Sequence, residues 1–289
     1  MGKVVLHADL NNFYASVACV SHPEWRELPL AVCGDPALRH GIVLAKNMPA
    51  KHRGVITGQA VWQARQTCPG LMTVAPDLEE VLRYSGIVRR IFARYTNRVQ
   101  PFGVDEAWLD ISGPRTDIED GFCIANHLRH TVREETGLTL SVGVGDNRIF
   151  AKLGSDLKKP DGVSVVCAEN RRTVLDPLPV DSLIFIGRAT TRKLHAIGIF
   201  TVGQLAAVDP NVLRAVFGKT GLMLSGFARG DDAASVIAED TQPKMKSVGN
   251  SITTAHDVVT AYDVRITLYG LCDSVASRMR KHEVVGRVV

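Results

Sequence analysis

Hydrophobic positions along the chain change their spacing at several points, and each change predicts a different element. The opening run KVVLHAD is apolar and ends in a carboxylate, which is typical of a strand, and NNFYASVACV then places Phe13, Val17 and Val20 at helical spacing. Asp9 therefore stands at a predicted strand-to-helix junction. From residue 21 to 76, prolines and glycines break the chain into short pieces, which predicts a compact insertion of small elements.

Two longer segments in the first half of the chain have helical periodicity. Residues 77–97 carry apolar side chains on one stripe that includes Leu82, and a proline–aspartate pair at their start favours helix initiation. Residues 117–136 repeat the pattern, with Phe122 among the side chains expected to point inward. The segment LTLSVGVG that follows alternates apolar with small residues, as a central strand does.

A predicted hairpin separates these two helices. The runs RVQPFGV and AWLDI both have strand character, and Asp105 and Glu106 stand between them, at or beside the turn. One more helix is expected over Ile149, Leu153 and Leu157. The order of elements is that of a ferredoxin-like α+β domain with a large insertion after its first strand. We expect a mixed sheet that helices cover on one face.

The second half of the chain changes to short helical elements separated by glycines. From Asp176 onward the pattern predicts a separate small all-α domain, and residues 236–246 are polar enough for a linker. A strand-like SVGNSITT, a helix from about Tyr262 to His282 and a strand-like VVGRVV follow. Because the last of these begins as the sequence stops, we expect the final domain to be incomplete.

The composition is that of a folded protein. At 289 residues, with 45% hydrophobic and 22% charged, the chain is long enough for about two to four compact units. Six cysteines are scattered without a C-x-x-C pair, which favours a reducing cytoplasm over a disulfide framework or a thiolate zinc site. No apolar run approaches the roughly 18 residues of a membrane span, so we expect a soluble protein. A net charge of +4 permits a polyanionic partner without requiring one.

Three carboxylates are candidates for a metal site. Asp9 ends the first predicted strand, and Asp105 and Glu106 lie at the hairpin expected beside it, so the three should converge. A divalent cation would relieve their repulsion, and oxygen ligands favour Mg²⁺ or Mn²⁺ over zinc. Such a site suits phosphoryl transfer, in which one ion activates a hydroxyl and another neutralises a leaving pyrophosphate. Taken alone, an acidic pair in a hairpin is more often turn chemistry.

Three segments resemble a known family. DLNNFYASVACV, FGVDEAWLDIS and SVGVGDNRIFAKLGSDLKKPDG are similar, in order and separation, to signature segments of the Y-family translesion DNA polymerases, and the first is most similar to the DinB/UmuC-like, ImpB/MucB/SamB branch. The resemblance spans nearly the whole chain. It implies a ferredoxin-like palm with a fingers insertion, an all-α helix-hairpin-helix thumb and a partial α/β little finger. The implied divisions are palm at 1–10 and 77–166, fingers at 11–76, thumb at 167–235, linker at 236–246 and an incomplete little finger at 247–289.

The resemblance also implies roles for particular residues. Two Mg²⁺ ions, for which Mn²⁺ could substitute, would be held by the catalytic acids Asp9, Asp105 and Glu106 and by the backbone carbonyl of Leu10. Tyr14 matches the aromatic gate that excludes a ribonucleotide 2′-OH, although outside this family it would be an ordinary helix-face aromatic. The implied nucleotide-binding residues are Phe13, Tyr14, Met48, Lys51 and Lys159, of which Lys159 would reach the triphosphate.

Two segments match the family pattern only in part. KNMPAK places Met48 and Lys51 where the family has a tyrosine and an arginine in the fingers, so we expect weaker binding of the triphosphate. LIFIGRATTRKLHAIGI resembles a helix-hairpin-helix, which presents backbone N–H groups to DNA phosphates, with Arg188 in place of its second hairpin glycine. The DNA-binding candidates are Gly187, Arg188, Arg192, Lys193, Lys244 and Lys246.

The implied function is template-directed, low-fidelity DNA polymerisation for translesion synthesis by a bacterial, cytoplasmic monomer. Its partners would be primer–template DNA and dNTPs, with no membrane, and a sliding clamp or a recombinase filament is conceivable. Two alternatives stay open. Met48 and Lys51 are compatible with a catalytically impaired DNA-binding scaffold of the same fold. A nucleotidyl cyclase would share the palm-like sheet but would need neither fingers nor thumb.

Overall fold

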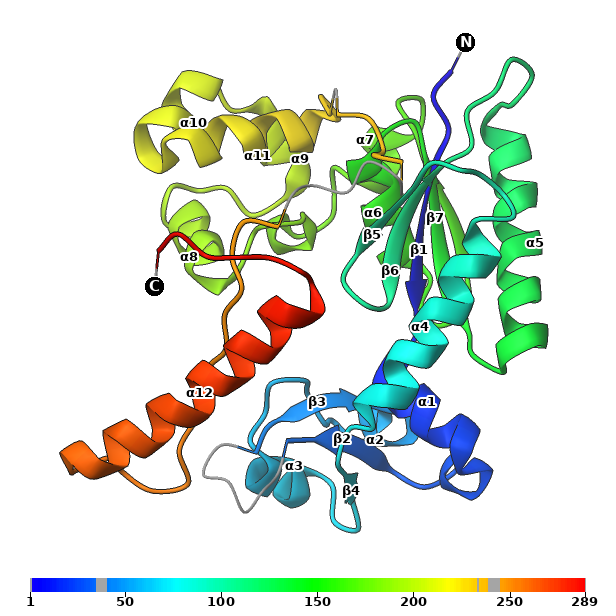
Figure 1. Cartoon of the computed structure of the whole chain (residues 1–289). Helices are drawn as coiled ribbons and strands as arrows, with labels where there is room; N and C mark the ends of the chain where they lie inside the picture. The colour runs from blue at the N-terminus through cyan, green and yellow to red at the C-terminus, as the bar shows by residue number, and fades with distance from the viewer. Residues whose placement is uncertain (1, 35–40, 233, 239–244, 289) are drawn as a thin grey trace. The chain divides into compact units, whose positions relative to one another are not determined.

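The computed structural model describes residues 2–34, 41–232, 234–238 and 245–288 (Figure 1). Its contacts divide the chain into two units. The first unit comprises Met1–Phe13 and Glu79–Thr241, and the second comprises Tyr14–Leu78 and Gln242–Val289. Among the described residues, no helix is both long and apolar enough to cross a membrane.

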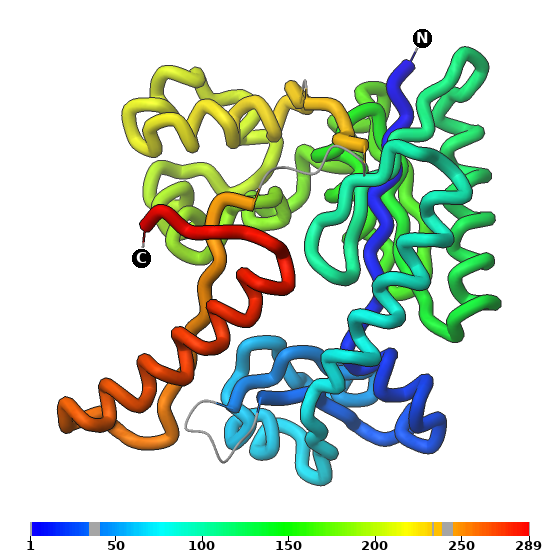
Figure 2. Tube along the Cα trace, viewed as in Figure 1, coloured from blue at the N-terminus to red at the C-terminus, as the bar shows by residue number. Residues whose placement is uncertain are grey.

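The first unit is built on a five-stranded sheet in the order β5-β6-β1-β7-β8. The strands are β1 (Val5–Leu10), β5 (Val99–Phe102), β6 (Glu106–Asp110), β7 (Leu140–Gly145) and β8 (Val163–Val166). Strand β1 runs antiparallel to both of its neighbours, whereas β7 and β8 are parallel. In Figures 1 and 2 the N-terminal segment, in blue, lies among green segments from much later in the chain. All six residues of β1 are buried, as expected of a central strand. The mixed α+β fold is therefore confirmed.

Helices pack on both faces of this sheet, so the prediction that helices cover one face is wrong. The helices beside the sheet are α4 (Leu78–Phe92), α5 (Ile118–Thr136) and α6 (Arg148–Leu157). In β7, Val144 lies against Gly121 of α5, whereas the neighbouring Gly143 lies against the backbone of α6. Because adjacent residues of a strand point to opposite faces, α5 and α6 cover opposite faces. A Cβ at Gly143 would collide with the carbonyl oxygen of Ala151, so this glycine permits the close approach of α6.

Two apolar side chains expected in the core are on the surface. Leu82 of α4 is 61% exposed and Phe122 of α5 is 42% exposed. The buried stripe of α4 runs through Val81 and Val88, and Leu82 falls just outside it. In α5 the position against the sheet is taken by Gly121, where there is no room for a side chain. Phe122 is consequently left at the edge of the contact.

The remainder of the first unit is helical, as predicted. Its helices are α7 (Arg171–Val174), α8 (Arg188–Ala196), α9 (Val202–Ala207), α10 (Pro210–Phe217) and α11 (Lys219–Arg229). This region shares one hydrophobic core with α6 and β8, in which Phe150 and Leu153 pack with Leu194, Leu213 and Leu224. The core fixes α6 between the sheet and the helical region.

The second unit contains the predicted insertion of short elements. These are α1 (Phe13–Ser21), which begins at the boundary, β2 (Leu30–Cys33), β3 (Val43–Lys46), α2 (Met48–His52), α3 (Val61–Thr67) and β4 (Met72–Val74). A three-stranded sheet of order β3-β2-β4 organises them around a small core that includes Val43, Val55 and Leu71. The side-chain oxygen of Asn47 caps α2 by accepting from the N–H of Ala50.

The last part of the chain contains one helix, α12 (Ala261–Lys281), close to the predicted bounds. The two segments with strand-like sequence, 247–254 and 284–288, do not form strands among the described residues. A strand needs a neighbour to satisfy its backbone N–H and C=O groups, and neither segment is paired with another described segment. Strand-like composition was therefore a poor guide here.

Candidate metal centre and active site

The acids predicted to form a site are brought together by the pairing of β1 with β6. Asp9 and Glu106 are direct partners across the two strands. The N–H of Leu10 donates to the carbonyl oxygen of Asp105 at 3.0 Å, which joins the end of β1 to the β5–β6 turn. Residues nearly one hundred positions apart in the sequence thus become neighbours.

The β5–β6 turn lets Asp105 approach the same site as Glu106. Phe102 and Glu106 are paired, so three residues form the loop between them. Gly103 adopts a positive φ of 85°, which disfavours other residues, and the Arg89 guanidinium donates to its carbonyl oxygen at 2.8 Å. Asp105 lies in the turn rather than on the regular strand, and therefore escapes the alternation that would direct it away from Glu106.

The two neighbouring acids have pKa values shifted in opposite directions. Burial, followed by the negative charges of Glu106 and Asp9, raises the pKa of Asp105 to about 6. Burial also favours the neutral form of Glu106, but the contacts with His7 and Lys152 outweigh it and lower the pKa of Glu106 to about 2. The negative charge of Glu106 is therefore compensated by its neighbours, whereas that of Asp105 is not.

Two lysines compensate the other acids. The Nζ of Lys152 lies 3.0 Å from Oδ2 of Asp9 and 2.7 Å from Oε2 of Glu106. The Nζ of Lys159 lies 2.8 Å from Oδ2 of Asp9 and 2.8 Å from Oδ1 of Asp156. Burial alone would lower the pKa of each lysine, but the nearby carboxylates raise it. Lysine 152 was not predicted, although Lys152, Asp156 and Lys159 recur at helical spacing and could have been recognised as one charged face.

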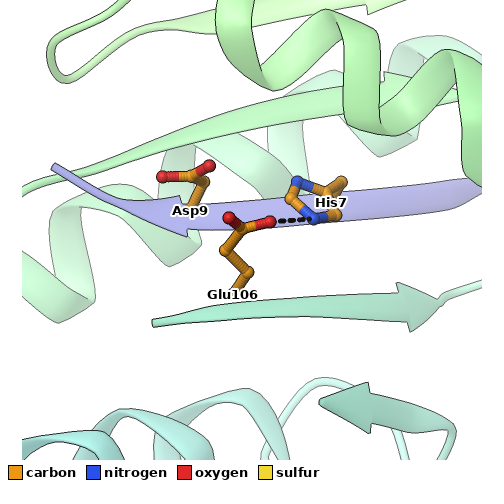
Figure 3. A group of neighbouring side chains, drawn as sticks. All are labelled: His7, Asp9 and Glu106. Atoms are coloured by element: carbon orange, nitrogen blue, oxygen red, sulfur yellow. Dashed lines mark ion pairs between the residues drawn. The ribbon is translucent and has the colours of Figure 1, made fainter. Parts of the chain in front are cut away.

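His7 is a second residue that the sequence alone did not suggest. It is fully buried on β1, two residues before Asp9, with its Nε2 3.2 Å from Oε2 of Glu106 (Figure 3). Its Nδ1 lies 2.9 Å from Oγ of Ser155. Burial lowers the pKa of His7. One ligand atom each from His7, Asp9 and Glu106 lie within 4.8 Å of one another. His7 lies two residues before the candidate acid Asp9 on one strand, and hence on the same face of the sheet, which was the available signal in the sequence.

The arrangement suits a hard divalent cation. Asp9 and Glu106, whose ligand atoms lie close together, and Asp105 in the adjoining turn offer carboxylate oxygens, the ligands that Mg²⁺ and Mn²⁺ prefer. Burial, and then the charges of Glu106 and Asp9, raise the pKa of Asp105, so its ionised form is unfavourable without a further positive charge. A bound cation would remove this repulsion.

The other predicted residues lie in several parts of the structure. Phe13 is buried in the first unit, whereas Tyr14 and Met48 are half-buried and Lys51 is exposed in the second unit. The thumb candidates lie at the start of and along α8, where Gly187 is the N-cap. The exposed members of the DNA-binding set are Gly187, Arg188, Arg192, Lys193 and Lys246, while Lys244 lies outside the described residues.

Comparison with protein-family models gives three matches along the chain. The impB/mucB/samB family matches residues 8–156, the thumb domain of DNA polymerase-iota matches residues 182–232, and the C-terminal domain of the impB/mucB/samB family matches residues 245–289. The first match alone covers more than half of the chain. Together with the acid site in a palm-like sheet, it shows that the chain belongs to the impB/mucB/samB family, within the Y-family DNA polymerases.

Individual relatives agree with this assignment. The chain is 46% identical over 289 residues to DNA polymerase IV of Acetivibrio thermocellus, an alignment that covers 100% of this chain and 72% of the relative. It is 34% identical over 283 residues to DNA polymerase IV 1 of Bacillus subtilis, covering 98% of this chain and 68% of the relative.

Solved structures show the same fold. DinB from Sulfolobus solfataricus aligns with a TM-score of 0.73 and 26% identity, covering 81% of this chain and 69% of that structure. A Y-family DNA polymerase chimera aligns over 95% of this chain and 80% of its own, with a TM-score of 0.86 and 24% identity. A nucleotidyl cyclase is accordingly not favoured.

Proposed function

We propose that Asp9, Asp105 and Glu106 are the metal-binding acids with which this chain, a DNA-directed DNA polymerase, carries out low-fidelity translesion synthesis. The observation that supports these roles is the pairing of Asp9 with Glu106 beside the turn that contains Asp105. The enzyme transfers a nucleotide from a dNTP to a primer 3′-hydroxyl under the direction of a template.

The four candidate ligands are Asp9, Asp105, Glu106 and the backbone carbonyl of Leu10. When bound there, two Mg²⁺ ions would lower the pKa of the primer hydroxyl and neutralise the leaving pyrophosphate. Lys152 would hold Asp9 and Glu106 at a fixed separation, since its ammonium contacts both.

The candidates for binding the nucleotide are Phe13 and Lys159 in the first unit and Tyr14, Met48 and Lys51 in the second. Lys159 has a flexible side chain with an ammonium 2.8 Å from Asp9, so a triphosphate could draw it a short way without removing it from the site. Tyr14 would exclude a ribonucleotide 2′-OH, with Phe13 beside it in the sequence. Met48 cannot donate a hydrogen bond and Lys51 lacks the two-pronged donor set of an arginine, so we expect their grip on the triphosphate to be weak.

DNA would be held by backbone N–H groups and positive side chains around α8. Helix N-termini attract phosphates, and exposed Arg188, Arg192 and Lys193 lie along this helix. Lys246 and Lys244 would add charge further along the chain. We assign palm to 1–10 and 77–166, fingers to 11–76, thumb to 167–235, linker to 236–246 and little finger to 247–289. The setting would be the bacterial cytoplasm, with the chain acting as a monomer.

Primer extension on a template with an abasic site tests this function. With Mg²⁺ and dNTPs, the chain should extend the primer past the lesion, and this product should be absent without divalent metal. A DNA bandshift without extension would support the scaffold instead, and cyclic nucleotide formed from NTP alone would support the cyclase. DNA affinity should fall steeply as salt rises, because phosphate contacts release counterions.

A further inference from the structure

His7 connects helix α6 to one of the proposed catalytic acids. Its ring lies fully buried between Ser155 on α6 and Glu106 on β6. The ring also makes an edge contact with Trp108, at 5.1 Å between centroids and 64° between planes. Trp108 is itself fixed, since its Nε1–H donates to the carbonyl oxygen of Arg148 at 2.9 Å. The imidazole is therefore held on three sides.

The hydrogen-bonding partners determine how the protons on this ring are arranged. An ionised carboxylate only accepts, so the nitrogen facing Glu106, Nε2, must carry a proton to bond to it. Nε2 is buried, 3.2 Å from Oε2 of Glu106, and makes no well-aligned hydrogen bond to this oxygen or to any other described residue, so a small rotation of the Glu106 side chain is needed to complete the bond. In a neutral imidazole the other nitrogen, Nδ1, then accepts from the hydroxyl of Ser155 at 2.9 Å. The same hydroxyl donates to the carbonyl oxygen of Lys152 at 2.7 Å, and because it has a single proton it must turn from this carbonyl to Nδ1 when Nε2–H faces Glu106.

The contact involves only one oxygen of the Glu106 carboxylate. His7 lies beside Oε2, whereas the second oxygen points away from His7 on the side of Asp9 (Figure 3). Lys152 contacts the same Oε2 at 2.7 Å. A carboxylate held by one oxygen presents the other in a defined direction, and partners of this kind commonly orient metal ligands in proteins.

We propose that His7, supported by Ser155, is a positioning residue that holds Oε2 of Glu106 and so directs the remaining oxygen toward the metal ion. This inference rests on the proposed function. His7 touches neither substrate nor metal in this role. It acts by reducing the rotation of the Glu106 side chain before the ion arrives.

The test uses direct metal binding as well as activity. His7→Phe keeps an aromatic ring against Trp108 but removes both nitrogens. In the full chain without DNA or nucleotide, Mn²⁺ binding measured by electron paramagnetic resonance should weaken about 10-fold to 100-fold, the range typical when such a partner is lost. In primer extension kcat should fall and the Mg²⁺ requirement should rise, while KM for dNTP and Kd for DNA stay within about twofold.

Two serine variants provide the matched comparison. Ser155→Ala removes the support behind His7, and should weaken Mn²⁺ binding in the same direction by a smaller factor. Ser164→Ala is the control, because Ser164 is also buried and its hydroxyl has no hydrogen-bond partner among the described residues. Its Mn²⁺ affinity should be unchanged. His7→Gln, which retains a side-chain donor, should recover part of the lost affinity.

Three results would overturn the proposal. If folded His7→Phe binds Mn²⁺ with an affinity within twofold of that of the unmodified chain, then His7 is not needed to position Glu106. A nitrogen coupling from a bound imidazole in the Mn²⁺ spectrum, lost in His7→Phe, would make His7 a ligand instead. If His7→Phe unfolds, Ser155→Ala decides, and unchanged Mn²⁺ affinity in that variant rejects the proposal. Failure of the proposed function is recognised separately, as an absence of primer extension by the unmodified chain.

Discussion

The acid site of the first unit and the nucleotide-binding candidates of the second differ in how strongly their surroundings constrain them. Asp9 and Glu106 are fixed by strand pairing and share the ammonium of Lys152. Lys51, in contrast, is exposed on the five-residue helix α2, and its side chain forms no ion pair with another described residue. Charges gathered in a half-buried site require a compensating network, whereas a surface cation does not. The first site should therefore tolerate substitution far less than the second.

The largest effect should come from Asp105→Ala in the first unit. It removes a carboxylate whose charge the lysines leave uncompensated, so we expect nucleotide incorporation to fall about 1,000-fold or more, as when a preorganised charge-stabilising group is lost. DNA affinity should stay nearly unchanged, because the acid acts mainly in the transition state. Single-turnover primer extension and a DNA-binding titration measure the two quantities. Equal loss of both would indicate misfolding and would remove the contrast between the two regions.

A second prediction distinguishes the two lysines that directly follow α6. Lys159 contacts Asp9 and Asp156, whereas the neighbouring Lys158 is exposed and its side chain has no ion-pair partner among the described residues. Lys159→Ala should raise KM for dNTP about 10-fold to 100-fold, the range expected for a lost hydrogen bond to a charged group. Lys158→Ala should change it less than twofold. Similar effects of the two variants in steady-state kinetics would show that bulk charge, and not position, matters here.

The sequence predicted the elements of the first unit well because their signals are local. Hydrophobic spacing placed β1, α5 and β7, and the turn residues placed Asp105 and Glu106 at a hairpin. It did not reveal that α6 approaches the face opposite α5. That arrangement depends on Gly143, whose missing side chain admits another backbone, and a glycine alone does not indicate which segment approaches it.

The sequence patterns predicted the acids of the candidate site but not the residues that contact and position those acids. The acids occupy the ends of elements, where sequence patterns are informative. His7 and Lys152 were missed because their importance depends on contacts between β1, β6 and α6 that no local pattern records. The prediction of strands near the C-terminus was wrong for a related reason, because a strand forms only where another strand can pair with it.

A third prediction concerns the second unit. Met48→Tyr restores the side chain that the family has at this position, and a new hydrogen bond to the triphosphate should lower KM for dNTP about 3-fold to 10-fold. Met48→Leu keeps the apolar character and should leave KM unchanged. Steady-state incorporation opposite an undamaged template measures both. If Tyr and Leu behave alike, Met48 has no role in binding the triphosphate, and the weak-grip interpretation fails.

The smallest expected effect is on stability and again separates the two regions. In the metal-free protein the pKa of Asp105 is about 6, above its ordinary value of 3.8, so its ionisation is less favourable in the folded state than in the unfolded state. As the pH rises from the lower to the higher of these two pKa values, the free energy of unfolding therefore falls. Asp105→Asn has no carboxyl group to ionise, so it should not lose this stability. In EDTA the variant should match the unmodified chain near pH 4 and melt about 2–4 °C higher at pH 7.

Saturating Mg²⁺ should reverse this order, because an ion bound only by the folded state stabilises the protein that retains the carboxylate. Lys51→Met in the second unit is the matched comparison, since Lys51 is exposed and its like-charged neighbour is the cation of Lys46, not a carboxylate; its change in Tm should not vary over the same pH range. Thermal melts at several pH values, with EDTA or Mg²⁺, measure both variants. A Tm difference for Asp105→Asn that stays constant from pH 4 to pH 7 would mean that neither burial nor the neighbouring acids raise the pKa of Asp105, so that there is no unfavourable charge for a cation to relieve.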